Sequence, residues 1–173
     1  ISSSQGRGPI SIIVLVALVV RLLAILFVPE NIGLDNPTYQ FSASDFLENG
    51  MISNCCIMPL YPLMLAIFGG GEEAQLFIGM VAGVCSVVLI WALARCMFES
   101  ETIGLVAAGM MAVFPMAIFY SVIGLTESLF VVFVLAAFLA LYKNKLVLTS
   151  IFFTLSILAR PTIDIFAPFV IFW

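Results

Sequence analysis

Apolar segments about as long as a bilayer is thick recur along this chain. The first covers residues 9–29 and is interrupted only by Arg21. A helix rises about 1.5 Å per residue, so about 20 apolar residues cross the roughly 30 Å of hydrocarbon in a membrane. The pattern therefore predicts an all-α, polytopic transmembrane helix bundle forming a single domain over residues 1–173. The remaining predicted spans are 74–98, 102–122, 125–142 and 146–160, with the start of a sixth at 163–173.

Composition indicates whether lipid or water surrounds these helices. The chain is 64% hydrophobic and 9% charged, with a mean hydropathy of +1.25. A soluble globular protein is about 45–50% apolar and about 25% charged. The sequence therefore predicts an integral membrane protein whose immediate partners are membrane lipids.

Charge and residue usage exclude several classes of function. The six basic residues are scattered singly and the net charge is -4, so no basic patch is present that could bind nucleic acid. The chain has no histidine and no carboxylate cluster with the spacing of metal ligands. We therefore predict no cofactor, and the sequence does not support a metal site.

The long segment between the first two spans, residues 30–73, is predicted to lie outside the cytoplasm. It contains no Lys or Arg, whereas basic residues in short loops favour the cytoplasmic side. Its apolar section at 58–68 is too short to cross a bilayer and predicts a short interfacial helix. We expect a cytoplasmic N-terminus, a non-cytoplasmic loop and a location in the plasma (inner) membrane.

Small residues and a proline indicate how the spans pack. Only residues 99–101 separate the second and third spans, which predicts an antiparallel hairpin. Pro115 is expected to kink the third span near its outer end. Close helix approach is predicted at Gly79, Gly83, Ala108, Gly109 and Ala112.

Two acidic residues are candidates for chemistry. Asp35 follows the first span, and it is either an ordinary loop acid that begins a turn at Asn36 and Pro37 or a carboxylate positioned at the interface. Glu127 lies between apolar segments, where an ionisable group usually faces a cavity or a partner. The alternative for Glu127 is a helix N-terminal acid with Thr126 as the cap.

Two arginines also admit two interpretations. Arg21 interrupts the first span, and its side chain either extends toward the outer interface or binds a phosphate. Arg160 either anchors the end of the fifth span or binds a phosphate in the same bidentate way. Because the spans alternate in direction, Asp35, Glu127 and Arg160 are predicted to share the non-cytoplasmic face.

Several segments, taken in order, resemble a known family. They read LDNPTYQFSASDFLENG, PLYPLMLAIFG, FPMAIFYSVIGLTESLF and LSILARPT. Together they resemble the N-terminal half of the GT-C superfamily of membrane glycosyltransferases, in particular proteins similar to dolichyl-phosphate-mannose protein mannosyltransferases. The matching positions are Asp35, Tyr39, Leu47, Gly50, Pro59 through Pro62, Pro115, Tyr120, Ser121, Thr126, Glu127, Arg160, Pro161 and Thr162.

This resemblance implies a GT-C-like fold and a function. The donor would be a sugar linked to a polyprenyl phosphate, transferred to an acceptor hydroxyl on the non-cytoplasmic face. Asp35 would act as general base, and Glu127 would orient the acceptor or the base. The implied substrate-binding residues are Tyr39, Tyr61, Arg160 and Arg21, with the arginines balancing charge on the leaving phosphate.

A second interpretation comes from the length of the chain. Members of the resembled family usually have more spans, whereas Trp173 falls inside the expected sixth helix. We therefore expect either a fragment of a longer enzyme or a truncated, non-catalytic subunit that packs against partner membrane subunits.

Overall fold

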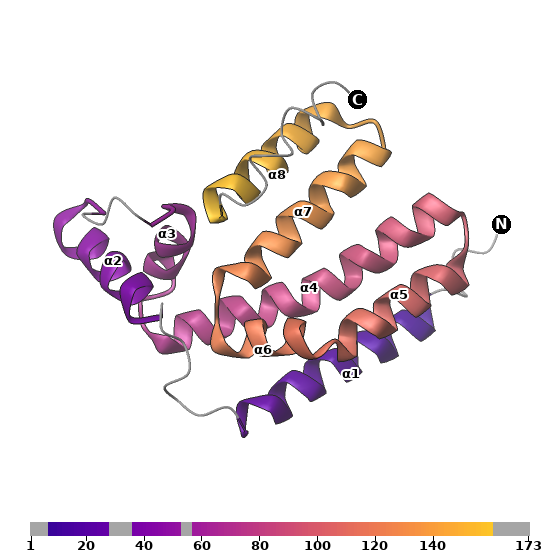
Figure 1. The fold of residues 1–173 in the computed structure, drawn as a ribbon, viewed down its shortest axis with the longest axis horizontal. Coiled ribbons are helices and arrows are strands. Elements are labelled where there is room, and N and C mark those ends of the chain that lie inside the picture. The colour runs from indigo at the N-terminus through magenta and orange to yellow at the C-terminus, as the bar shows by residue number, and fades with distance from the viewer. Residues whose placement is uncertain (1–6, 28–35, 53–56, 161–173) are drawn as a thin grey trace.

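The computed structural model describes residues 7–27, 36–52 and 57–160, and every regular element within them is a helix (Figure 1). The prediction of an all-α membrane helix bundle is confirmed. The helices are α1 (Arg7–Ile25), α2 (Asn36–Asn49), α3 (Leu60–Ile67), α4 (Glu72–Phe98), α5 (Glu101–Val113), α6 (Pro115–Ile123), α7 (Thr126–Tyr142) and α8 (Leu146–Ala159).

The long apolar helices match the length that a membrane requires. In the described residues, α1 and α4 are each long and apolar enough to cross a bilayer, and α5 with α6 form a third candidate if the bent pair is one span. α7 and α8 begin and end close to the predicted bounds but contain only 17 and 14 residues. They are apolar helices shorter than the roughly 20 residues of a standard span. The predicted sixth span at 163–173 lies outside the described residues.

The third span is broken at the predicted proline. α5 and α6 meet at an angle of 55°. Between them Phe114 is extended, with φ −66° and ψ 116°, because a residue before proline is disfavoured in the helical region. Pro115 then begins α6, where its missing N–H and fixed φ are tolerated.

A tight turn joins α4 to α5 as the predicted hairpin. Glu99 ends α4 in the left-handed conformation, and the Ser100 hydroxyl accepts a hydrogen bond from the Ile103 N–H to begin α5. Across the turn, Arg95 Nε lies 2.8 Å from Glu101 Oε2. The Trp91 indole N–H donates to the same carboxylate at 3.0 Å. These contacts hold α4 and α5 together at this end of the bundle.

The opposite end of the bundle gathers elements far apart in the sequence (Figure 1). The end of α1, the beginning of α4, the α6–α7 turn and the end of α8 all lie there. The helices of the long loop, α2 and α3, pack against each other at this end, and α3 also packs against α4 and α8. Glu127 and Arg160 therefore lie at the same end of the bundle, whereas the side of the membrane that this end faces stays a prediction.

Glycines on α4 allow the α6–α7 segment to approach closely, as predicted. A Cβ at Gly79 would lie 2.2 Å from the Ser121 carbonyl oxygen, and one at Gly83 would lie 2.6 Å from Arg21 Nε. Ala108 and Ala112 are also buried. Gly109 is different, because a Cβ there would meet nothing within 4 Å.

We predict that Gly79→Ala destabilises the protein by about 1–3 kcal/mol, because the added methyl group would overlap a backbone carbonyl that cannot move alone. Thermal unfolding in detergent micelles measures this effect. Gly109→Ala is the matched control, and we expect it to be neutral or stabilising by up to about 1 kcal/mol, since alanine is the better helix former. Equal melting temperatures for the two variants would contradict the close contact.

Candidate active site

An ion pair joins two helices at the end of the bundle opposite the α4–α5 turn. Arg160 Nη1 pairs with Glu127 Oε1. Glu127 is in the first turn of α7, and Arg160 directly follows α8. The side chains are 24% and 38% exposed, respectively, so the pair borders the surface. Both residues were site candidates from the sequence, and the fold brings them together although they are 33 positions apart in the chain.

The local sequence explains both placements. α8 ends at Ala159, and Arg160 is extended (φ −158°, ψ 125°), as expected for a residue preceding a proline. Glu127 lies where the positive end of the α7 dipole favours an acid. The suggested cap is wrong, because Leu125 is the N-cap and α7 already includes Thr126. The Thr126 hydroxyl instead donates to Glu127 Oε2 at 3.3 Å.

Two tyrosines from the long loop lie beside this pair. The rings of Tyr39 on α2 and Tyr61 on α3 pack edge to face, with centroids 5.1 Å apart and planes at 81°. Tyr61 is fully buried, and its hydroxyl donates to the carbonyl oxygen of Gly124 in the α6–α7 turn. This hydrogen bond fastens the loop helices to the turn that precedes Glu127.

Burial raises the pKa of the Tyr61 hydroxyl, and the neighbouring Tyr39 and the Glu127 carboxylate raise it further. A hydrogen bond with Gln75 acts in the opposite direction. The hydroxyl therefore stays protonated and remains a donor to the Gly124 carbonyl.

Sequence reasoning missed two glutamines. Gln75, in the first turn of α4, is 2% exposed, and its Oε1 accepts from Gln40 Nε2 at 2.6 Å. Gln40 follows Tyr39 on α2. The signal was present, since an amide at the start of an apolar span requires partners once it is buried. These glutamines tie α2 to α4.

An apolar cluster supports the polar groups. It includes residues of α2, α3, α4, α7 and α8. Two buried members, Ala74 and Ala159, adjoin Gln75 and Arg160 in the sequence, and Leu129 lies two residues after Glu127. Their packing fixes the backbone from which those side chains extend. The buried members are Ala43, Tyr61, Leu65, Ala66, Ala74, Ile78, Leu129 and Ala159.

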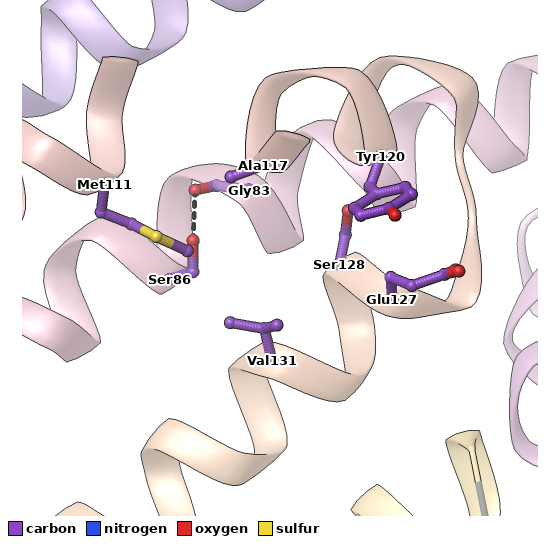
Figure 2. A pocket seen from close by; sticks show the side chains of 8 residues that line it. All are labelled: Gly83, Ser86, Met111, Ala117, Tyr120, Glu127, Ser128 and Val131. Atoms are coloured by element: carbon purple, nitrogen blue, oxygen red, sulfur yellow. Dashed lines mark hydrogen bonds between the residues drawn. The ribbon is translucent and has the colours of Figure 1, made fainter. Parts of the chain in front are cut away.

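Glu127 also borders a small pocket between α4, α5, α6 and α7 (Figure 2). Its volume is about 30 Å³, more than the roughly 10–15 Å³ that a single water needs. Ser128 Oγ is buried and has no hydrogen-bond partner within the described part of the chain. The lining residues are Gly83, Ser86, Met111, Ala117, Tyr120, Glu127, Ser128 and Val131.

Two other predicted residues are placed differently or not described. Arg21 is fully buried between α1, α5 and α6, where it contacts Ser121 rather than extending toward the interface. Asp35 lies outside the described residues. In the ranges that the structure describes, no group of three or more His, Cys, Asp or Glu could hold a metal ion. With Asp35 undescribed, the prediction of no metal or cofactor stays a prediction.

A comparison of the sequence with known protein families finds a match. The profile described as dolichyl-phosphate-mannose-protein mannosyltransferase matches residues 59–173, well over half of the chain. The chain belongs to this family. The matched part contains Tyr61, Glu127 and Arg160, whereas Arg21, Asp35 and Tyr39 precede it. Neither the curated proteins nor the solved structures contain a match.

This family indicates a membrane glycosyltransferase of the GT-C type, as the sequence resemblance implied.

We predict that Tyr61→Phe lowers the free energy of unfolding by about 1–3 kcal/mol, since it leaves the buried Gly124 carbonyl without its donor. The matched control is Tyr142→Phe, at the exposed end of α7, which should change little. Thermal unfolding in detergent compares the two variants. A melting temperature of Tyr61→Phe as high as that of Tyr142→Phe would show that the hydrogen bond contributes nothing.

Proposed function

We propose that this protein transfers a sugar from a polyprenyl-phosphate-linked donor to an acceptor hydroxyl at the non-cytoplasmic face of the membrane. The observation that carries the proposal is the Glu127–Arg160 pair, held beside Tyr61 at the end of the bundle to which the long loop returns. Membership of the dolichyl-phosphate-mannose-protein mannosyltransferase family supports mannose as the sugar and a lipid phosphate as the leaving group.

Arg160 has the chemistry to bind the lipid phosphate. Its guanidinium is paired with one carboxylate but remains 38% exposed, so further N–H groups are available to an anion from outside. A guanidinium presents a planar fork of donors that matches phosphate oxygens. Glu127 balances the charge of Arg160 before the donor arrives and holds the guanidinium in one orientation.

Asp35 supplies the general base in this proposal. It is bonded to Asn36, the first residue of α2, and precedes Tyr39 by four positions. Tyr39 packs on Tyr61, so the helix that follows Asp35 in the sequence contributes a side chain to the candidate site.

The proposed reaction balances without a cofactor. The Asp35 carboxylate takes the proton of the acceptor hydroxyl as its oxygen bonds to the anomeric carbon of the sugar. The bond between that carbon and the phosphate oxygen breaks, and its electron pair stays on the phosphate. Arg160 stabilises the negative charge that develops there. The products are the glycosylated acceptor and the free polyprenyl phosphate.

The side of the membrane follows from charge. Arg95 in the last turn of α4, and Lys143 and Lys145 between α7 and α8, belong to the end of the bundle opposite the Glu127–Arg160 pair. Basic residues in such turns favour the cytoplasm, which supports a site facing the other side.

We predict that Asp35→Asn lowers transfer about 100-fold or more, because a positioned general base contributes roughly 10²–10⁴ to the rate. The assay supplies radiolabelled polyprenyl-phosphate mannose to membranes containing the full-length protein and follows label into the protein fraction. Glu48→Gln is the control, since it removes an exposed carboxylate of α2 and should leave transfer unchanged. Wild-type rates in Asp35→Asn would eliminate Asp35 as the base.

We predict that Arg160→Gln lowers kcat by about 100-fold through loss of charge stabilisation on the leaving phosphate. Arg160→Lys should retain more activity but raise the KM for the donor, since a lysine cannot bind a phosphate with two parallel N–H groups. The same donor assay, run over a range of donor concentrations, separates the two constants.

Arg95→Gln is the matched control for Arg160, because it breaks a comparable ion pair at the opposite end of the bundle. Its transfer rate should equal that of the wild type. If both glutamine variants lose activity equally, the loss comes from weakened folding and Arg160 has no special part in transfer.

A further inference from the structure

The broken span leaves backbone groups that need partners inside the membrane. The last carbonyls of a helix have no intrahelical donors, and proline lacks the N–H that would continue the ladder. Ala112 belongs to the last turn of α5, immediately before the break at Phe114 and Pro115. An unsatisfied carbonyl in hydrocarbon costs several kcal/mol. The last carbonyls of α5 therefore need hydrogen-bond donors from neighbouring helices.

Arg21 of α1 reaches both sides of the break. Its Nη1 donates to the Ala112 carbonyl of α5 at 3.4 Å, and its Nε donates to the Ser121 hydroxyl of α6 at 3.1 Å. Nη1 also bonds to the Ala17 carbonyl of its own helix at 3.0 Å. One side chain thus connects α1 to both halves of the bent span.

The surroundings are shaped to hold this guanidinium. Arg21 has no exposed surface, and a Cβ at Gly83 of α4 would lie 2.6 Å from Nε and 2.7 Å from the Ser121 Cβ. In the described ranges no carboxylate forms an ion pair with Arg21, and its Nη2 has no hydrogen-bond partner. The negative end of the α5 dipole meets the guanidinium at the Ala112 carbonyl and is a favourable counter-charge for it.

Ser121 connects the hydrogen bonds of Arg21 to the candidate site. α6 ends at Ile123, Gly124 follows in the left-handed conformation, and Glu127 lies three residues further along. The Ser121 carbonyl packs on Gly79, and the Gly124 carbonyl accepts from Tyr61. The bend between α5 and α6 thus determines where the turn carries Glu127.

We infer that Arg21 is a positioning residue that fixes the bend between α5 and α6 and, through Ser121, the location of Glu127. The effect on transfer rests on the proposed function, whereas the effect on the bend does not. The buried guanidinium presents no surface to a donor phosphate, so Arg21 acts through the helices it joins.

Spin labels placed across the break test the bend directly. In full-length protein with Cys55, Cys56, Cys85 and Cys96 replaced by serine, labels at exposed Val106 of α5 and Met116 of α6 report the distance across it. Arg21→Met should shift or broaden this distance distribution, while Leu22→Met, an exposed neighbour on α1, should leave it as in the wild type. Ser121→Ala should give a smaller change and add little in the Arg21→Met background. An unchanged distribution in Arg21→Met would overturn the inference.

Kinetics distinguish positioning from phosphate binding. We expect Arg21→Met to lower kcat about 10- to 100-fold with the donor KM within about twofold, because a misplacement of about 1 Å costs that much in rate. A raised donor KM with an unchanged bend would assign Arg21 to the phosphate instead. If Arg21→Met does not fold, Arg21→Lys and Ser121→Ala carry the same measurements. If the wild type transfers no mannose, the proposed function fails while the label distances still decide the role of Arg21.

Discussion

The contact between α4 and the α6–α7 turn supports the position of Glu127 and the docking of Tyr61. Two glycines face each other in it: a Cβ at Gly79 would lie 3.1 Å from the Gly124 Cα, and one at Gly124 would lie 2.8 Å from the Gln75 carbonyl oxygen. Gly124 also has a φ of 71°, which favours glycine. Backbones therefore meet at van der Waals distance, as small residues permit between membrane helices. Glu127 follows directly from this turn.

The loop helices depend on the same contact. Tyr61 reaches the Gly124 carbonyl only because the turn lies against α4, and its burial completes the apolar cluster shared by α2, α3, α4, α7 and α8. Tyr39 then packs on the Tyr61 ring. In this way a segment that the sequence places between two spans becomes part of the bundle and brings the beginning of α2 toward Glu127 and Arg160.

Much of the architecture could be predicted because hydropathy and proline act locally. Lengths of apolar runs located the helices, and Pro115 located the break. Side-chain direction could not be predicted, because a run that is apolar all round does not tell which face Arg21 occupies. No sequence pattern indicates that the Tyr61 hydroxyl donates a hydrogen bond to a backbone carbonyl. Gly109 shows the opposite limit, since this small residue stands between the buried Ala108 and Ala112 in the sequence but proved to lie beside open space.

The two arginines show how burial separates roles that the sequence leaves equivalent. Arg21 is satisfied mainly by carbonyls and a hydroxyl within the bundle and has no exposed surface. Arg160 has a carboxylate partner and more than a third of its side chain exposed. For Arg21 to bind a phosphate, the contact between α1 and α6 would have to open. Arg160 needs only to share its N–H donors with an arriving anion. The same guanidinium chemistry therefore serves structure at the buried position and, in the proposed reaction, substrate at the exposed one.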